Sequence, residues 1–193
     1  MRPSKDDPLL DHDRIVSAAW ELVEQDGLAG LSSRKLAAKL GVKGPAIYYH
    51  VPSMQDLYGM MIERLLEMAL ERTPQTDDWR EWIRNLAHNH CTILLEFPDS
   101  GRIASLSRPT DTMRKDVVPQ FSEVLMRAGL PRNKALAATG ALGSFILGYV
   151  INLQHEGHLE FASSIHPVSE TFDFAVDAFV EALARDMVVG GGR

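Results

Sequence analysis

Two short helical segments joined by a few residues constrain the fold of this chain more than any other feature. In residues 32–40, apolar side chains recur at helical spacing after a pair of serines, and Gly41 follows as a helix stop. Pro45 then supplies the fixed φ of a first helical turn, and "PAIYYHV" allows about two turns. A helix, a glycine turn and a second short helix form a helix-turn-helix, whose second helix enters the major groove of DNA.

The rest of the sequence is also helical by its periodicity. Apolar residues recur at spacings of three and four between glycines and prolines, whereas alternating β-branched runs are nearly absent. We therefore predict an all-α protein, with further helices within residues 11–27, 53–74, 77–97, 100–106, 108–129, 131–157 and 167–187. Pro119 is expected to kink the helix that Gly129 ends.

The long helix after residue 52 divides the chain into two predicted parts. Residues 1–52 are expected to form a three-helix domain that contains the helix-turn-helix, and residues 53–193 a larger helical bundle. Ser53 and Asp56 have the spacing of a capping box, which marks the start of a connecting helix over 53–73.

Composition bounds the class of protein and its compartment. A hydrophobic content of 45% is sufficient for a buried core, and the single cysteine, Cys91, excludes an internal disulfide. The N-terminus has no apolar signal segment, and no uninterrupted apolar run reaches the roughly 18–20 residues of a membrane helix. We therefore expect a cytoplasmic protein that does not enter a membrane.

Positive charge is concentrated in the helix-turn-helix, although the whole chain has a net charge of −6. Residues 32–50 contain no acid, and their four bases are Arg34, Lys35, Lys39 and Lys43. Such a patch suits contact with phosphates and electrostatic steering toward nucleic acid. A solvated basic face is the alternative interpretation.

The second helix of the motif has an unusual set of side chains. Ile47 is expected to hold it to the core, so its neighbours cannot all be buried as well: they are Ala46, Tyr48, Tyr49 and His50. The two hydroxyls and the imidazole can contact phosphates or base edges, and Gly44 and Pro45 leave the start of the helix open for close approach. The alternative is that one tyrosine packs in the core and that His50 only caps the helix.

The stretch "GLSSRKLAAKLGVKGPAIYYHVPSMQDL" resembles the DNA-binding domain of the tetracycline-repressor (TetR) family of transcriptional regulators, without a gap from about Arg14 to Leu70. The resemblance implies three DNA-binding helices, a connecting helix, and a bundle that binds a ligand and dimerises. It also implies a regulator that is usually a repressor released from a palindromic operator. The implied DNA contacts are Ser33, Arg34, Lys43, Gly44, Pro45, Ala46, Tyr48, Tyr49 and His50.

Residues 107–156 resemble the C-terminal domain of the tetracycline-repressor subfamily, in which Arg108 and Gln120 fall on positions that line the antibiotic pocket. Four positions depart from that subfamily. Ala104 replaces its metal-coordinating histidine, and Ala69 replaces a drug-binding histidine. Leu86 stands in place of an asparagine, and Asn152 in place of a glutamate. A magnesium–tetracycline chelate would lose its metal anchor and its main polar contacts. We therefore predict that this protein does not respond to tetracycline.

The altered pocket is expected to hold an unidentified small, largely apolar effector with one or two hydrogen bonds. Its candidate lining is Met61, Leu86, His90, Arg108, Gln120, Phe145 and Asn152. The alternative is that the apolar members only fill the core, and that His90 is an ordinary core histidine.

Two helices are expected to form a homodimer. The apolar helix near 134–153 and the striped helix near 168–187 carry more apolar surface than a chain of this size can cover, and their small residues allow close helix approach. A two-fold bundle of these helices would also place the two reading helices about one DNA turn apart.

Other classes of function are less consistent with the sequence. His88 and His90 in "HNHC" are two residues apart and point to different faces of a helix, whereas a shared metal needs a spacing of three or four. No nucleophile–base pair or phosphate-binding loop is evident, so we expect no enzyme, no metal site and no cofactor. The alternative that stays open is a helical adaptor or sensor without regulated DNA binding.

Overall fold

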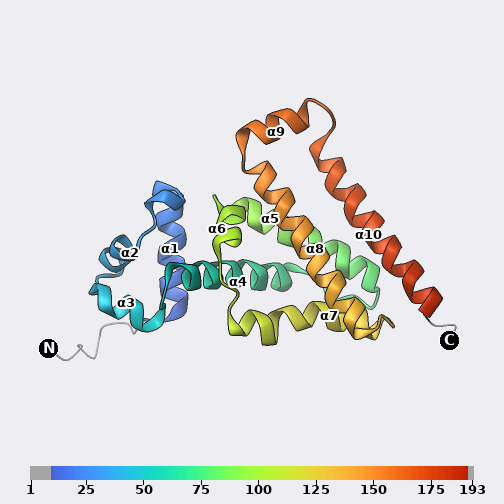
Figure 1. Ribbon diagram of the computed structural model, residues 1–193, viewed down its shortest axis with the longest axis horizontal. Coiled ribbons are helices and arrows are strands. Elements are labelled where there is room, and N and C mark those ends of the chain that lie inside the picture. The colour runs from blue at the N-terminus through green and yellow to red at the C-terminus, as the bar shows by residue number, and fades with distance from the viewer. Residues whose placement is uncertain (1–9, 191–193) are drawn as a thin grey trace.

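The computed structural model describes residues 10–190, which form helices and connecting turns and contain no β-strand. Three helices form a small head at one end of the molecule, and one long helix joins the head to a larger body (Figure 1). This confirms the all-α prediction. The division between residues 52 and 53 stays a prediction, and residues 1–9 and 191–193 of the two expected parts lie outside the described residues.

The head consists of α1 (His12–Asp26), the short 3-10 helix η1 (Leu28–Gly30), α2 (Ser33–Leu40) and α3 (Gly44–His50). Its turns are determined locally, as the sequence predicts. Ser32 Oγ accepts a hydrogen bond from Lys35 N at the start of α2, and Gly41 ends this helix with a left-handed φ of 69°. Ile47 is only 2% exposed, which confirms that it holds α3 to the core.

The connecting helix is α4 (Met54–Arg72), and its first turn is capped as predicted. Ser53 Oγ accepts from Asp56 N at 3.2 Å and donates to the Asp56 carboxylate at 2.6 Å. The helix packs against α1 in the head and against the body helices, so it is the mechanical link between the two parts.

The body begins with α5 (Trp79–Glu96) and α6 (Ser100–Leu106), followed by the π-helical turn η2 (Met113–Val117) and α7 (Val118–Arg127). Pro119 lies in the first turn of α7, directly after the π-helical turn. Because proline lacks an N–H and clashes with the preceding helical turn, the irregularity falls just before it. The helix is therefore irregular at the predicted place, and Gly129, with a φ of 105°, follows its end.

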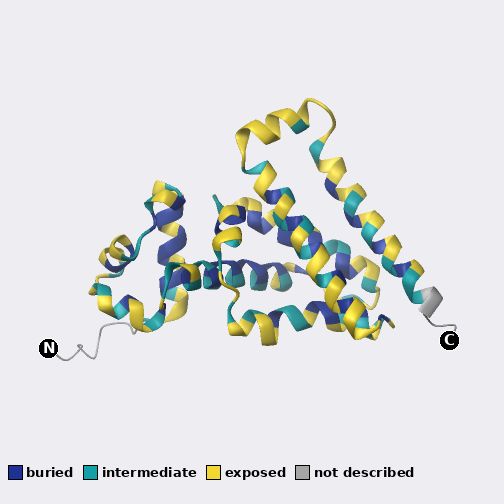
Figure 2. Cartoon of the chain, in the orientation of Figure 1, coloured by how far each residue is buried: buried dark blue, intermediate teal, exposed yellow. Residues whose placement is uncertain are grey.

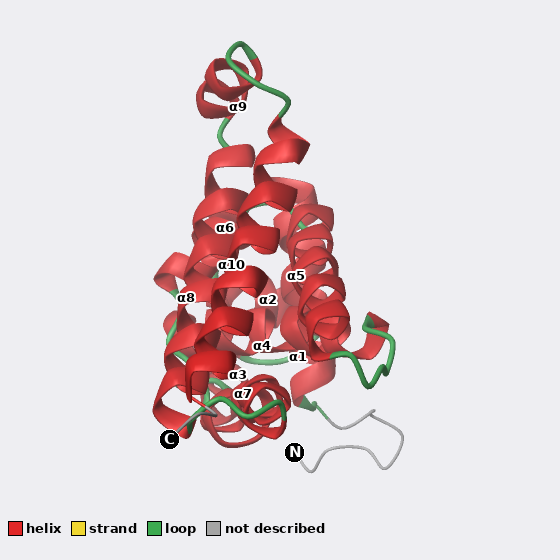
Figure 3. Cartoon of the chain, turned by 90° about the vertical axis from the view of Figure 1, so that its right-hand side faces the viewer, coloured by secondary structure: helices red, strands yellow, loops and turns green. Residues whose placement is uncertain are grey.

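The chain ends in α8 (Arg132–Leu153), α9 (Glu156–Ser163) and α10 (Val168–Gly190). The sequence predicts one helix up to residue 157 and misses α9. This short helix is separated from α8 by Gln154 and His155 and buries no residue, so it leaves no apolar stripe for periodicity to detect. Figure 3 looks onto α10, which lies between α8 and α5 in that view.

The single chain covers α8 on one side only, so the uncovered apolar surface that the sequence predicts for this helix is present. Only one stripe of α8 is buried, and it consists of Ala135, Ala138, Leu142, Ile146 and Val150. Figure 2 shows the exposed residues along α8 and α10 in yellow. By length and composition, α8 is also long and apolar enough to cross a membrane. Its most apolar 18-residue window has a mean hydropathy of 1.6, and 22% of that window is buried. The sequence criterion of an uninterrupted run missed this property, because polar residues such as Thr139 and Ser144 interrupt a segment whose mean hydropathy is still high.

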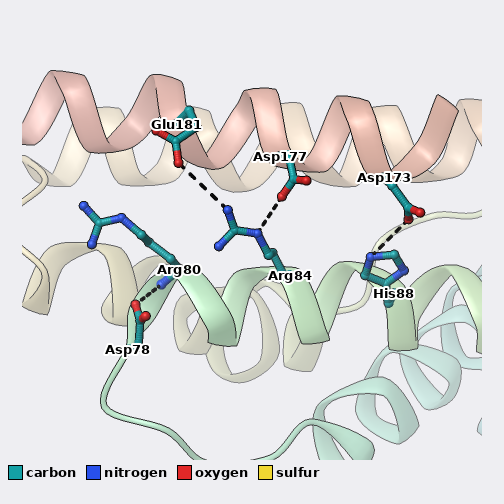
Figure 4. A network of polar contacts seen from close by, with 7 residues as sticks. All are labelled: Asp78, Arg80, Arg84, His88, Asp173, Asp177 and Glu181. Carbon is teal, nitrogen blue, oxygen red and sulfur yellow. Dashed lines mark hydrogen bonds and ion pairs between the residues drawn. The ribbon is translucent and has the colours of Figure 1, made fainter. Parts of the chain in front are cut away.

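A ladder of polar contacts fixes α10 against α5 (Figure 4). Arg84 Nε donates to Asp177 at 2.6 Å, and one helical turn away His88 Nε2 lies 3.5 Å from Asp173. These side chains are largely exposed, so each contact contributes about 1 kcal/mol or less. The apolar attachment comes from Phe172, which is buried and whose ring stacks on Phe145 of α8 with centroids 5.5 Å apart.

Candidate DNA interface and effector cavity

The exposed face of the head carries the predicted DNA-contacting side chains on α2 and α3. Tyr49 is 88% exposed and Tyr48 is 54% exposed, although apolar rings of this size are usually buried. The Tyr48 and Ser33 hydroxyls share a hydrogen bond of 3.1 Å, which joins the second helix of the motif to the start of the first. The alternative that one tyrosine packs in the core is wrong.

The start of α3 is unobstructed. Lys43 precedes the helix in an extended conformation, and a Cβ added at Gly44 would meet no atom within 4 Å. Pro45 and Ala46 follow with short side chains, so the backbone at this end of the helix can approach a partner closely. His50 ends α3, with its ring 5.3 Å from that of Tyr49 and 6.1 Å from that of His12.

Two bases of the predicted positive patch are already paired within the head. Lys35 Nζ lies 2.7 Å from Asp26, and Lys39 Nζ lies 2.6 Å from Glu21. Both carboxylates belong to α1, so the patch appears acid-free in the sequence but not in space. Within residues 10–190 no ion pair is formed by Arg34 or Lys43, which makes these two the strongest candidates for contact with phosphates.

The body contains an apolar cavity of about 100 Å³. Its walls come from five helices, and they consist of Leu66 of α4, Ile83, Leu86 and His90 of α5, Val118, Phe121 and Leu125 of α7, Ala138, Thr139, Leu142, Gly143 and Ile146 of α8, and Phe179 of α10. No charged side chain belongs to this lining. The cavity therefore touches both the connecting helix and the helix that follows the π-helical turn.

His90 is the unusual member of this lining. The residue is 7% exposed, and among the described residues its Nε2 has no hydrogen-bond partner. Burial lowers the pKa of His90 from 6.5 to about 4, so the imidazole is neutral at pH 7. This unpartnered nitrogen is available to a ligand in the cavity, and whether His90 binds an effector or only packs the core stays a prediction.

The segment after α6 is fixed to the connecting helix. Arg108 N donates to Gln55 O at 3.0 Å, and the Arg108 guanidinium lies 3.4 Å from Asp56. Thr110 Oγ1 donates to the Glu63 carboxylate about two turns further along α4. Gly59 is required here, because a Cβ at this position would collide with Arg108 O. This segment is therefore in direct contact with α4 at three places, Gln55, Asp56 and Glu63.

The N-terminal and C-terminal parts each match a known family. Residues 15–60 match the family described as "Bacterial regulatory proteins, tetR family", and residues 73–184 match the "Tetracyclin repressor-like, C-terminal domain". The chain belongs to the TetR family. This TetR-family transcriptional regulator therefore has an N-terminal DNA-binding domain and a C-terminal ligand-binding domain, which confirms the resemblance in both parts.

Relatives of this TetR-family chain include a tetracycline repressor and a regulator solved with its DNA operator. The class A tetracycline repressor from transposon 1721 in Escherichia coli is 31% identical, over 90% of this chain and 82% of that protein. A TetR variant from Acinetobacter baumannii AYE, solved in complex with minocycline, has a TM-score of 0.77 at 27% identity, covering 93% and 99% of the two chains. BioQ, solved with its natural double-stranded DNA operator, has a TM-score of 0.71 at 25% identity, covering 91% and 99%.

The sequence predicts seven candidate lining residues, of which the resemblance implies Arg108 and Gln120, and the structure brings two of the seven to the cavity. Leu86 and His90 line it. Met61 is fully buried in the core cluster, and Phe145 lies in the aromatic cluster with Tyr149 and Phe172.

The other three are polar and exposed, contrary to the predicted lining. Arg108 turns to Asp56 because its segment is fixed to α4. Gln120 Nε2 donates to Asp116 O at 2.9 Å, a carbonyl in the π-helical turn before Pro119. Asn152 lies near the end of α8 and faces outward. The signal that sequence reasoning missed is the pairing of small residues on α8, Ala138 and Gly143, with the large side chains of α5 and α7.

Proposed function

We propose that this TetR-family regulator binds a palindromic DNA operator as a homodimer and is released when a small, largely apolar molecule enters the cavity of the body. Repression is the expected mode, and the cytoplasm is the expected compartment. The observation that carries the proposal is the α2–α3 surface, where two exposed tyrosines, Arg34 and Lys43 surround an open helix start.

Each predicted DNA-contacting residue has a role that fits its position. Arg34 and Lys43 are proposed to bind phosphates or base edges, and Ser33, Tyr48 and His50 to fix the backbone. The members at the start of α3 and on its outer face are proposed to lie against the floor of the major groove: they are Gly44, Pro45, Ala46 and Tyr49. Because few of these side chains donate hydrogen bonds, the base readout relies on apolar contact more than on a donor–acceptor code.

The homodimer is proposed to form through the exposed faces of α8 and α10. Gly140 and Gly148 lie on this face of α8, and a Cβ at either would meet nothing within 4 Å, so packing within the chain does not require a glycine there. Phe174 of α10 is 76% exposed. Small residues next to exposed apolar ones permit close approach of helices from a second copy. This arrangement covers α8 with protein and requires no membrane.

Release from DNA is proposed to follow a population shift. Leu66 places α4 in the cavity wall, and α7 forms another wall directly after the π-helical turn and Pro119. A molecule that binds more tightly to one arrangement of α4, α6 and α7 increases the population of that arrangement. Since α4 is packed on the head, the spacing between the two reading heads of the dimer would change.

A footprinting experiment tests the DNA part of this proposal. Purified protein is incubated with the DNA that flanks its own gene, and nuclease protection is measured. A protected palindrome whose half-sites lie about one helical turn apart supports the proposal. Absence of any protected site at concentrations where the protein is folded contradicts it and favours the adaptor or sensor alternative.

A further inference from the structure

The apolar lining of the cavity and the unpartnered His90 together limit the size and the chemistry of a ligand that can bind there. Its volume is about 100 Å³, and its lining contains no aspartate, glutamate, lysine or arginine. An engineered apolar cavity of about 150 Å³ holds benzene, so the smaller space here admits a single ring only when its walls move apart. A charged ligand would lose its hydration without gaining a partner, so the cavity excludes ions.

The polar groups of the lining leave one hydrogen bond to be made. Thr139 Oγ1 donates to Ala135 O at 2.9 Å, so its proton is already used. His90 Nε2 has no partner among the described residues. A ligand hydroxyl satisfies either tautomer of the neutral imidazole, because it both donates and accepts.

We propose that the cavity selects a neutral, single-ring molecule with one hydroxyl group, which forms a hydrogen bond with His90 Nε2 while the ring packs among Leu86, Phe121 and Leu142. This inference rests on the proposed function, since it names the chemical class of the effector. Entry of such a ring requires α7 to move outward, and the π-helical turn before α7 supplies the irregular backbone at which that movement would occur.

Three probes of matched shape test the selection. They are p-cresol, toluene, which lacks the hydroxyl, and 4-methylbenzoate, which is charged. Binding to the full chain without DNA is measured by titration calorimetry and by the shift in Tm. We expect p-cresol to bind at least tenfold more tightly than toluene, and 4-methylbenzoate not to bind.

Two variants locate the binding. His90→Phe keeps an aromatic ring but removes the nitrogen, so the preference for p-cresol over toluene should disappear. Gly143→Val fills the cavity, since a Cβ at Gly143 meets nothing within 4 Å, and it should prevent binding of both neutral probes.

Several results would overturn the inference. They are equal binding of p-cresol and toluene to the native chain, binding of 4-methylbenzoate, binding of no probe, or a preference for p-cresol that survives His90→Phe. The comparison of probes on the native chain remains decisive if His90→Phe fails to fold. DNA binding is recorded separately on the same preparation, so a failure of the probe test is distinguishable from a failure of the proposed regulator.

Discussion

The Asp99 carboxylate accepts a hydrogen bond of 2.8 Å from Leu28 N, which joins the corner between α5 and α6 to the turn between α1 and α2. These residues are 71 positions apart in the chain. The rings of Trp20 and Phe97 pack together in a tilted arrangement, with centroids 4.7 Å apart. The head is therefore held to the body at a second place besides α4, and a change at α6 has two routes to the DNA-binding surface.

Asp99→Ala removes this connection and should destabilise the protein. The variant leaves Leu28 N without its acceptor, so we expect a loss of about 1–2 kcal/mol in the free energy of unfolding, measured by urea denaturation. Asp99 also has a φ of 57°, which asparagine tolerates well, so Asp99→Asn should retain most of the stability. Equal losses in the two variants would show that the hydrogen bond does not carry the effect.

Tyr48→Phe should weaken DNA binding without weakening the fold. The phenol hydroxyl is exposed and bonds only Ser33 in the described residues, so its removal costs little stability. A lost phosphate contact corresponds to about 1 kcal/mol, or roughly fivefold in Kd, measured by fluorescence anisotropy. Tyr58→Phe on α4 is the matched control and should bind as the native chain does. Unchanged affinity in Tyr48→Phe would remove Tyr48 from the interface.

Phe174→Glu should convert the proposed dimer into monomers. The substitution places a charge in the middle of the exposed face of α10, where a partner copy would have to bury it. Sedimentation velocity measures the outcome. Arg127→Glu, a charge change on α7, should leave the dimer intact. A native chain that sediments as a monomer at all concentrations would contradict the proposed interface.

Stability should decrease between pH 6.5 and pH 4 through His90. The pKa of His90 is lowered to about 4 in the folded chain, so the unfolded chain binds a proton first as the pH falls from 6.5. The contribution is fully present above pH 6.5 and is lost through the window down to about pH 4, with an upper limit of about 3 kcal/mol. His90→Phe should flatten this part of the curve, whereas Leu86→Val should shift stability equally at every pH. An unchanged slope in His90→Phe would exclude His90 as its source.

Magnesium and tetracycline together should not release this protein from DNA. By the resemblance to the tetracycline-repressor subfamily, Ala104, Ala69, Leu86 and Asn152 stand where that subfamily has polar anchors, and the cavity lining holds no carboxylate. The measurement is a titration of the protein–DNA complex with the chelate, with p-cresol as the comparison. Release at micromolar chelate would show that the altered positions do not decide the effector.

The head was predictable from the sequence because its signals are local. The Ser32 cap, the left-handed Gly41 and the anchoring Ile47 each depend on neighbours within a few residues. The paired lysines were not predictable, since Lys39 and Glu21 meet only after α2 packs on α1.

The cavity was only partly predictable because its wall depends on long-range paths of the chain. Leu86 and His90 share a stripe of α5, and this stripe is visible in the sequence. Arg108 leaves the expected wall because Gln55 and Glu63 hold the segment after α6 against α4, and spacing along the chain does not reveal such contacts.

The salt dependence of binding to the protected DNA fragment tests the central claim most directly. Fluorescence anisotropy gives Kd at several salt concentrations, and sedimentation of the complex gives the number of protomers. We expect two protomers per palindromic site and a Kd that rises by at least tenfold between about 50 and 200 mM salt, as several phosphate contacts require. Arg34→Ala should reduce the slope of log Kd against log salt concentration by about one, because one phosphate contact is lost. A Kd independent of salt, or binding of a single protomer, would contradict the account of a dimeric DNA-binding regulator.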